Sequence, residues 1–183
     1  EVTEKSRARV MAMGELLATE IGACYLRSQG LEVAWLDARS VLRAEQREAA
    51  SIKASYLSAT CDFAPNAEAG AAVAAVGDVV ITQGFIASDD AGDTVLLGRG
   101  GSDTSGAYFA ALLAAQQLEI WTDVPGMFSA NPRSMPTARQ LLELTYDEAQ
   151  EIATAGAKVL HPRCLLPVRQ YGIPLFVYAT QVP

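Results

Sequence analysis

The segment with the clearest chemical potential is a glycine-rich stretch, GRGGSD, that precedes an alanine-rich run. Its adjacent residues Gly100 and Gly101 let the backbone approach a ligand closely, because no Cβ stands in the way. Ser102 or Asp103 is expected to cap a helix, whose N-terminal N–H groups attract an anion. Arg99 adds a planar guanidinium suited to a carboxylate or phosphate. The pattern predicts an anion-binding loop, and a structural turn with a surface arginine explains it equally well.

Two further segments combine turn residues with side chains that can bind a ligand. In WTDVPGMF, followed by NPR, Thr122 and Asp123 end a β-prone run close to an aromatic residue. Such a turn can hold a purine ring and ribose while Arg133 reaches a phosphate. In GAKVLHP, Lys158 is the only lysine in the second half of the chain. A structural turn and an ordinary surface lysine are the alternatives for these two patterns.

The histidine and the cysteines limit which catalytic and metal sites the chain could form. His161 is the only histidine, so a serine-type triad or a histidine-based metal site would depend on it alone. Cys24, Cys61 and Cys164 are far apart and outside any C-x-x-C spacing, which makes a poor set of zinc ligands. We expect no metal site built from protein ligands, a structural role for His161, and buried free thiols in a reduced, cytoplasmic protein.

Alternating helical and β-prone patterns predict the elements that position these segments. Helical spacing covers 6–29, 66–75, 103–117, 146–155 and 163–171, and β-prone runs cover 31–35, 79–82, 118–122 and 175–178. The continuous apolar run 79–82 is typical of a strand buried on both faces of a parallel sheet. A hairpin is expected within 84–101, a turn within 125–136, and 51–57 is ambiguous but compatible with an edge strand. We therefore expect one α/β domain on a mostly parallel sheet, with ligands outside the carboxyl ends of its strands.

Composition and missing motifs exclude several classes of protein. The chain has 183 residues, of which 50% are hydrophobic and 19% charged, with a net charge of −7 and no cluster of basic residues, so nucleic acid is not an expected partner. No apolar run is long enough to span a membrane, and the first residues lack the apolar core of a signal peptide. Walker, dinucleotide-binding, nucleophile-elbow and protein-kinase motifs are also missing.

Three segments together resemble one family. They are VVITQGFIASDDAGDTVLLGRGGSDTSGAYFAALLAA, IWTDVPGMFSANPR and EIATAGAKVLHPRCLLPVRQYGIPLFV. In this order and spacing they are similar to aspartate kinase of the amino-acid kinase family, from about Gly14 to Tyr178. The resemblance implies a three-layer αβα sandwich, with residues 1–183 forming part of a single catalytic domain. It also implies ATP-dependent phosphorylation of the L-aspartate side-chain carboxylate to 4-phospho-L-aspartate, the first step of lysine, threonine and methionine biosynthesis.

The resemblance carries roles to particular residues. For the aspartate site it implies Glu15 near the substrate amino group, Phe85 in the pocket, and the loop residues Arg99, Gly100, Gly101 and Ser102. Asp103 would orient the substrate amine or the cationic groups around it. For the nucleotide it implies Thr122 and Asp123 against adenosine, Arg133 as a further contact, and Lys158 on the ATP phosphates. Phe128 stands where relatives often have tyrosine, so it keeps the ring without the hydroxyl. One or two Mg²⁺ ions would be held largely by ATP.

One departure from the family pattern is important. Aspartate kinases open with a strand and a K-F-G-G-[TS] phosphate loop, and no segment of this sequence matches it. The C-terminal ACT regulatory domains have no counterpart either. The expectation is an incomplete kinase domain, nearly inactive by itself, whose oligomeric state and further domains the sequence leaves open. A non-catalytic ligand-binding or dimerisation module is the alternative, and kinases of glutamate or uridylate are minor alternatives within the enzyme class.

Overall fold

The computed structural model describes residues 2–46, 51–130, 134–155 and 159–181, in which helices and strands alternate. The helices are α1 (Glu4–Ser28), η1 (Ala38–Ser40), α2 (Ile52–Leu57), α3 (Ala67–Val76), α4 (Gly101–Leu112), α5 (Tyr146–Thr154) and α6 (Pro162–Gln170). The strands are β1 (Ala34–Leu36), β2 (Val80–Thr82), β3 (Ile86–Ser88), β4 (Thr94–Leu96), β5 (Leu118–Thr122), β6 (Met127–Phe128), β7 (Gln140–Leu141) and β8 (Leu175–Ala179). Within these residues, no helix is both long and apolar enough to cross a membrane.

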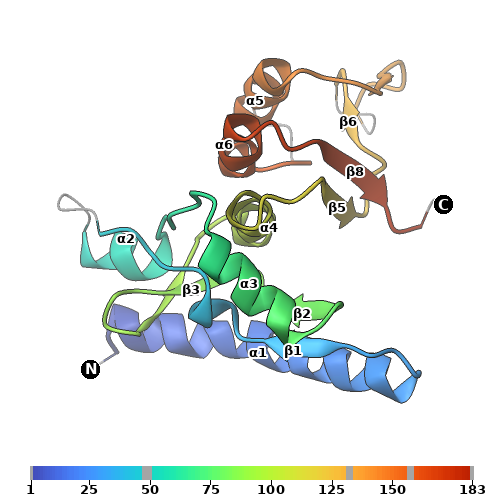
Figure 1. Cartoon of the computed structure of the whole chain (residues 1–183). Helices are drawn as coiled ribbons and strands as arrows, with labels where there is room; N and C mark the ends of the chain where they lie inside the picture. Colours follow the sequence, from blue (N-terminus) through green and yellow to red (C-terminus); the bar gives the residue numbers. More distant parts are fainter. Residues whose placement is uncertain (1, 47–50, 131–133, 156–158, 182–183) are drawn as a thin grey trace.

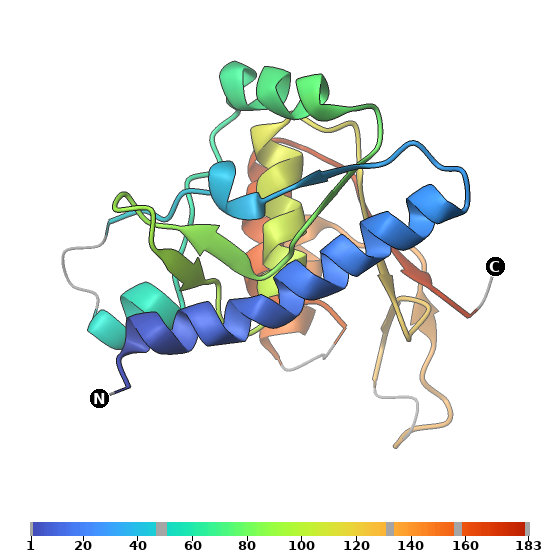
Figure 2. The same ribbon diagram turned by 90° about the horizontal axis from the view of Figure 1, so that it is seen from below.

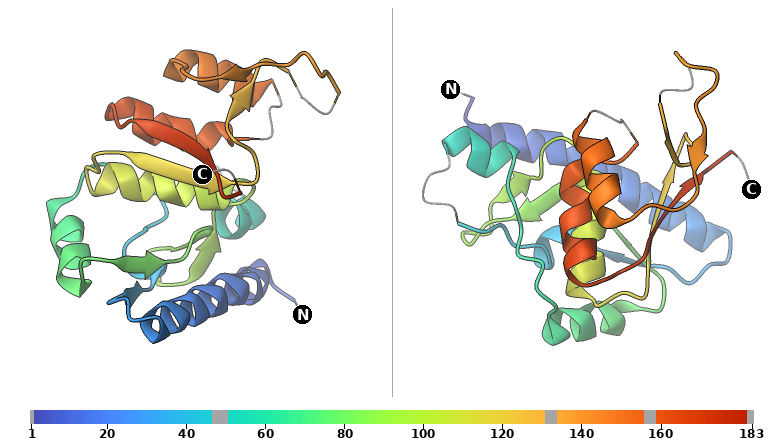
Figure 3. Two further views of the ribbon diagram at one scale, coloured as in Figure 1. Left: turned by 90° about the vertical axis from the view of Figure 1, so that its right-hand side faces the viewer. Right: turned by 90° about the horizontal axis from the view of Figure 1, so that it is seen from above.

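The strands form parallel pairs joined through helices, as an α/β fold requires. β1 pairs in parallel with β2, and β5 with β8, while β3–β4 and β6–β7 are antiparallel hairpins. Figure 1 shows α4 in the middle of the molecule, with α1 and the β1–β2 pair on one side and β5, β8, α5 and α6 on the other. The left view of Figure 3 shows the same succession of helical and strand layers. The predicted mostly parallel sheet is thus divided, within the described residues, into two-stranded parts.

Helix α1 confirms the first helical pattern, but most of its large apolar residues lie outside the core. Its fully buried residues are Ala8, Ala12 and Ala23. Ala8 and Ala12 lie in one cluster with Ile86 and Leu96 of the β3–β4 hairpin, and the partly buried Leu16 packs against it. Viewed from below, α1 lies across the strands β1 to β4 (Figure 2). Small side chains allow this close approach. The opposite face exposes large apolar side chains: Val10, Leu17, Ile21 and Tyr25 are 72%, 56%, 67% and 61% exposed.

One ambiguous segment is resolved and two local expectations were wrong. The ambiguous residues 51–57 contain helix α2, where the Ser51 hydroxyl accepts a hydrogen bond from Ala54 N (3.2 Å) and caps the first turn. The strand β2 is half-buried rather than buried on both faces. Within the turn predicted at 125–136 the chain forms β6, which pairs with β7, so this region is a hairpin. Short strands such as these carry too few residues for a period-2 pattern to be visible in the sequence.

The central helix α4 packs against α6, and the core forms on either side of it. Ala107 and Ala111 of α4 lie in one cluster with Leu165 and Val168 of α6, which is why a run of alanines was needed here. Cys61 and Cys164 are buried free thiols, as expected, whereas Cys24 is exposed and that expectation was wrong. Burial raises the pKa of both buried thiols to about 12.

Candidate functional site

The GRGGSD loop joins β4 to α4 through two residues in the left-handed region. Gly98 has φ +75° and Gly100 has φ +67°, and Gly100 itself is the N-cap of α4, with no side-chain hydrogen bond to the helix. The expectation that Ser102 or Asp103 caps the helix was therefore wrong. The helix begins at Gly101, so Ser102 and Asp103 belong to its first turn. Neither side chain caps the helix: Ser102 is exposed, and the half-buried Asp103 carboxyl lies next to the backbone N–H of His161.

The two adjacent glycines are required by the protein's own packing. A Cβ at Gly100 would lie 2.3 Å from the Cβ of His161, and a Cβ at Gly101 would lie 2.5 Å from Cδ2 of Phe85. Real Cβ atoms do not approach other heavy atoms so closely, so the loop is clamped between these two side chains. Arg99 and Ser102, by contrast, are exposed. The structure thus brings Phe85 and the loop together, as the resemblance implied, and adds His161 to the group.

Phe85 adopts a backbone conformation that residues other than glycine rarely tolerate. Its φ is +70°, which costs about 1–3 kcal/mol and persists only where surrounding contacts hold it. Its N–H donates to Ser105 Oγ (2.7 Å) and its carbonyl accepts from Leu97 N (2.8 Å). The Ser105 hydroxyl in turn donates to the Gly101 carbonyl (2.7 Å). Ser105 was missed from the sequence because its role depends on contacts across 20 residues.

A buried glutamine connects the strand β2 to the helix that carries Glu15. Gln83 follows β2 directly and is 1% exposed. Its Oε1 accepts from Ala38 N (2.8 Å), and its Nε2 donates to Thr19 Oγ1 (2.8 Å). Thr19 lies one turn after the half-buried Glu15 on α1. Gln83 therefore links α1 to the end of β2 and to the start of η1 through its two amide atoms.

Asp103 and His161 form the electrostatic centre of the site. Burial raises the pKa of the Asp103 carboxyl, and the neighbouring charge and backbone N–H of His161 oppose the rise. Burial also lowers the pKa of the His161 imidazole, and the charges of Arg163 and Arg99 lower it further. The neutral Nδ1 accepts from Arg163 N (3.3 Å) and caps α6, which is a structural role. The site therefore presents a carboxyl group beside a neutral imidazole.

The predicted nucleotide residues lie at the end of β5 and in the hairpin that follows. The Thr122 hydroxyl donates to Asp123 Oδ1 (3.1 Å), and the Thr122 carbonyl accepts from Thr180 N (2.9 Å) at the end of β8. Phe128 is half-buried in β6. Arg133 and Lys158 lie outside the described residues. Within the described part, no hydrogen bond or ion pair connects Thr122, Asp123 or Phe128 directly to the GRGGSD loop. These three residues make up the described part of the nucleotide half of the predicted site.

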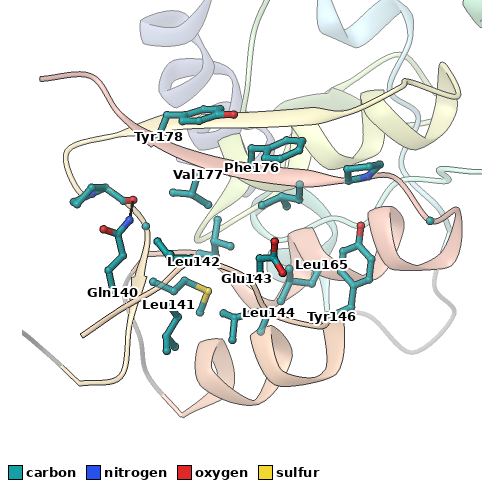
Figure 4. A pocket seen from close by; sticks show the side chains of 18 residues that line it. Gln140, Leu141, Leu142, Glu143, Leu144, Tyr146, Leu165, Phe176, Val177 and Tyr178 are labelled. Carbon is teal, nitrogen blue, oxygen red and sulfur yellow. Dashed lines mark hydrogen bonds between the residues drawn. The ribbon is translucent and has the colours of Figure 1, made fainter. Parts of the chain in front are cut away.

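A cavity of about 610 Å³ borders this second half. Side chains of β7, α5, α6 and β8 converge on it, and most of them are apolar (Figure 4). Pro125, Gly126 and Met127, which follow Asp123 in the chain, line one side, where the Pro125 carbonyl accepts from Gln140 Nε2 (2.6 Å). Thr122, Asp123 and Phe128 do not line it. Among the described residues, no cluster of three or more potential metal-binding side chains is present.

The sequence is similar to a known family of proteins over most of its length. Residues 1–179 match the model of the amino acid kinase family. The chain is 39% identical over 177 residues to lysine-sensitive aspartokinase 3 of Escherichia coli K12, covering 95% of this chain and 38% of that protein. It is 35% identical over 187 residues to aspartokinase of Chlamydia pneumoniae, covering 100% of this chain and 40% of that protein. The chain therefore spans about two fifths of the length of these relatives.

Solved structures show the same likeness. The crystal structure of E. coli aspartokinase III in complex with aspartate and ADP has a TM-score of 0.85 and 37% identity, covering 100% of this chain and 40% of that one. Aspartate kinase from Synechocystis has a TM-score of 0.77 and 31% identity, covering 98% and 28%. A UMP kinase from Bacillus anthracis, with a TM-score of 0.65 but 15% identity, shares the fold alone. The predicted αβα class is confirmed.

Proposed function

We propose that this chain, which belongs to the amino acid kinase family, is part of the catalytic domain of an aspartate kinase. The reaction would transfer the γ-phosphoryl group of ATP to the side-chain carboxylate of L-aspartate, giving 4-phospho-L-aspartate. The observation that carries the proposal is the GRGGSD loop, which is clamped between Phe85 and His161 while Arg99 and Ser102 remain exposed at the N-terminus of α4. The similarity to aspartokinases supports the same substrate.

The residues around the loop suit an amino acid with two carboxylates. Arg99 would clamp one carboxylate with its planar fork, and the N–H groups of Gly101 and Ser102 at the start of α4 favour negative charge. Glu15 and Asp103 would face the substrate ammonium group, and Phe85 would close the pocket. Burial raises the pKa of the Asp103 carboxyl. A substrate ammonium group beside it would lower that pKa and so favour the ionised carboxylate. In this assignment Arg99 and the N–H groups at the start of α4 bind a carboxylate of aspartate, while Asp103 orients its ammonium group.

The chemistry needs alignment more than proton transfer. A side-chain carboxylate has a pKa of about 4, so it is already an ionised nucleophile at neutral pH and needs no general base. Phosphoryl transfer depends mainly on positioning and on neutralising the charge of the transferring group. Lys158 would contact the ATP phosphates and supply part of that charge. The single histidine, which is engaged in capping α6, is not needed for catalysis.

The nucleotide would lie at the carboxyl end of β5. Thr122 and Asp123 would contact adenosine, Arg133 would add a further contact, and Phe128 would offer its ring without a hydroxyl. Mg²⁺ would enter with ATP and be held mainly by the ATP phosphates. When bound, the ion supplies charge neutralisation, and we assign no residue of this chain to it.

We also propose a pathway and a cellular compartment for this reaction. The reaction would be the first step of lysine, threonine and methionine biosynthesis, in the cytoplasm, and the protein would take neither nucleic acid nor a membrane as partner. Residues 1–183 would form part of one catalytic domain, with no ACT domain within them. Because these residues contain no K-F-G-G-[TS] loop, this chain alone would be nearly inactive. Homo-oligomers and additional domains are compatible with the proposal.

The test is a hydroxylamine-trapping assay on the full reading frame that encodes this chain. An acyl phosphate formed from ATP and aspartate is trapped as the hydroxamate, and parallel reactions contain glutamate or, with ADP release as the readout, UMP. We expect hydroxamate with aspartate alone. Product with glutamate or UMP instead would assign a different amino acid kinase. ATP and aspartate that bind without turnover would favour a non-catalytic binding module. The 183-residue chain, assayed alongside, tests whether it is nearly inactive alone.

A further inference from the structure

Arg163, in the first turn of α6, is bonded to segments far away in the sequence. One of its terminal nitrogens, Nη1, donates to the Leu97 carbonyl. The other, Nη2, donates to the Ala59 carbonyl (2.6 Å) and to Thr60 Oγ1 (3.4 Å). These partners lie 66 to 104 residues away along the chain. A single side chain therefore joins α6 to the end of β4 and to the 59–60 segment.

Only a guanidinium can make this set of contacts. Its donors are arranged in a rigid planar fork, whereas a lysine ammonium is a single point with rotating donors. Arg163 is half-buried, and it takes part in none of the ion pairs found among the described residues. Its charge opposes the effect of burial on the pKa of Cys61 and Tyr108, so it lies close to this buried region. The side chain is thus satisfied by carbonyl oxygens rather than by a carboxylate.

The hydrogen bond from Arg163 to the Leu97 carbonyl holds the residue that immediately precedes the GRGGSD loop. Leu97 immediately precedes Gly98, and its N–H donates to the carbonyl of Phe85 (2.8 Å). Next to it, Ala59 N donates to the Leu96 carbonyl (2.8 Å), so the two carbonyls that Arg163 binds belong to neighbouring segments. The Leu97 peptide is therefore held on one side by Phe85 and on the other by Arg163.

The start of α6 also contacts the middle of the loop. His161, two residues before Arg163, packs against Gly100, and its backbone N–H and ring act on the Asp103 carboxyl. The start of α6 therefore contacts the loop at two points. Arg163 is bonded to Leu97, just before the loop begins, and His161 packs against Gly100 in its middle. In the sequence, Lys158 precedes this turn by a few residues.

We propose that Arg163 is a positioning residue for phosphoryl transfer, which fixes the register of the aspartate loop against the start of α6. Through that register the substrate carboxylate on the loop is aligned with the γ-phosphoryl group that it attacks. This inference rests on the proposed aspartate kinase activity. Misplacement of about 1 Å by a remote substitution can cost about 100-fold in rate. Removing Arg163 is therefore expected to affect turnover as well as stability.

The test compares Arg163→Met, Arg163→Lys and Arg169→Met in the full reading frame. Met keeps the bulk of the side chain without its donors, and Lys keeps the charge without the fork. Arg169 is the control, since it lies on the same helix with an exposed ion pair to Asp147. With all proteins well below their melting temperatures, we expect Arg163→Met to lower kcat by about 10–100-fold and to raise the KM for aspartate more than that for ATP. Arg163→Lys should recover part of kcat, and Arg169→Met should match the wild type.

A purely structural role predicts a different result. If Arg163→Met lowers Tm while kcat and both KM values stay within about twofold of the wild type, the proposal is wrong. Should Arg163→Met fail to fold, Arg163→Lys carries the same kinetic comparison. Hydrogen exchange of the amides in 97–103 gives a readout that needs no activity. Faster exchange there in the Arg163 variants supports the positioning role even if the wild type phosphorylates a different substrate, and unchanged exchange contradicts it.

Discussion

Gly100 and His161 are in such close contact that no side chain can be added between them. A Cβ at Gly100 would lie 2.3 Å from Cβ and 2.4 Å from Cγ of His161. Because the backbone of His161 is fixed as the N-cap of α6, the ring cannot move away without disturbing that helix. The contact therefore ties the conformation of the predicted aspartate loop to the packing of α6.

Gly100→Ala should destabilise the protein by about 3 kcal/mol, through overpacking together with an unfavourable positive φ. Gly92→Ala is the matched control: it also has positive φ (+78°), but nothing lies within 4 Å of its Cβ position. Its cost should be about 1 kcal/mol. Urea denaturation of both variants gives the comparison. Equal losses would mean that the contact with His161 is not a steric constraint.

Ser105→Ala should release the strained backbone of Phe85. The hydroxyl bridges Phe85 N and the Gly101 carbonyl, both at 2.7 Å, so its loss leaves the part-buried Phe85 N–H without this partner and removes a buried hydrogen bond to the Gly101 carbonyl. We expect a loss of about 1–3 kcal/mol in unfolding free energy and a higher KM for aspartate. Thr154→Ala, which removes an exposed hydroxyl bonded to the Gln150 carbonyl, is the control and should be nearly neutral. An unchanged aspartate KM in Ser105→Ala would remove Phe85 from the pocket.

Arg99→Ala should raise the KM for aspartate about tenfold or more, because one substrate carboxylate loses a charged, bidentate partner. The KM for ATP should change little. Arg9→Ala, an exposed arginine on α1, provides the control for a change in net charge. Steady-state kinetics of the full reading frame, with each substrate varied in turn, gives both constants. A change confined to the KM for ATP would reverse the division of the site between its two substrates.

The cysteines should differ sharply in reactivity. Burial raises the pKa of Cys61 and Cys164 to about 12, whereas Cys24 is exposed. Iodoacetamide at pH 8 should therefore label Cys24 in the folded protein and all three thiols in urea, as measured by mass spectrometry. The same shifts predict that stability falls as pH rises from about 9 to about 12, since the unfolded thiols ionise first. Labelling of Cys61 or Cys164 in the folded protein would contradict their burial.

Most of the helices could be predicted from the sequence, because their signals are local. The periodic apolar residues of α1, the capping residue Asn66 before α3 and the polar first turn of α5 lie within the elements they define. The strand runs around β5 and β8 were equally clear. The helix α2 has six residues, and the strands β6 and β7 have two each. They could not be predicted because such short elements show no periodic pattern of apolar residues.

The loop glycines could be singled out from the sequence, but the side chains that surround them could not. The loop glycines were identified as places where a ligand can approach, whereas their neighbours are Phe85 and His161. The exposed apolar face of α1 has the same helical spacing as a buried one, so burial could not be assigned from pattern alone. Ser105 and Arg163 carried no local signal, since each acts on partners that only the tertiary fold brings near.

The clamped glycines also limit how the loop could be altered, over evolution or by design, to accept a different ligand. At Gly100 and Gly101 any new side chain collides with the protein before it can meet a ligand. Only the exposed positions Arg99 and Ser102 remain open to substitution within the loop's first four residues after Gly98. A library that aims at a new carboxylic acid should therefore randomise these two positions together with Glu15 and Phe85, and leave the glycines unchanged.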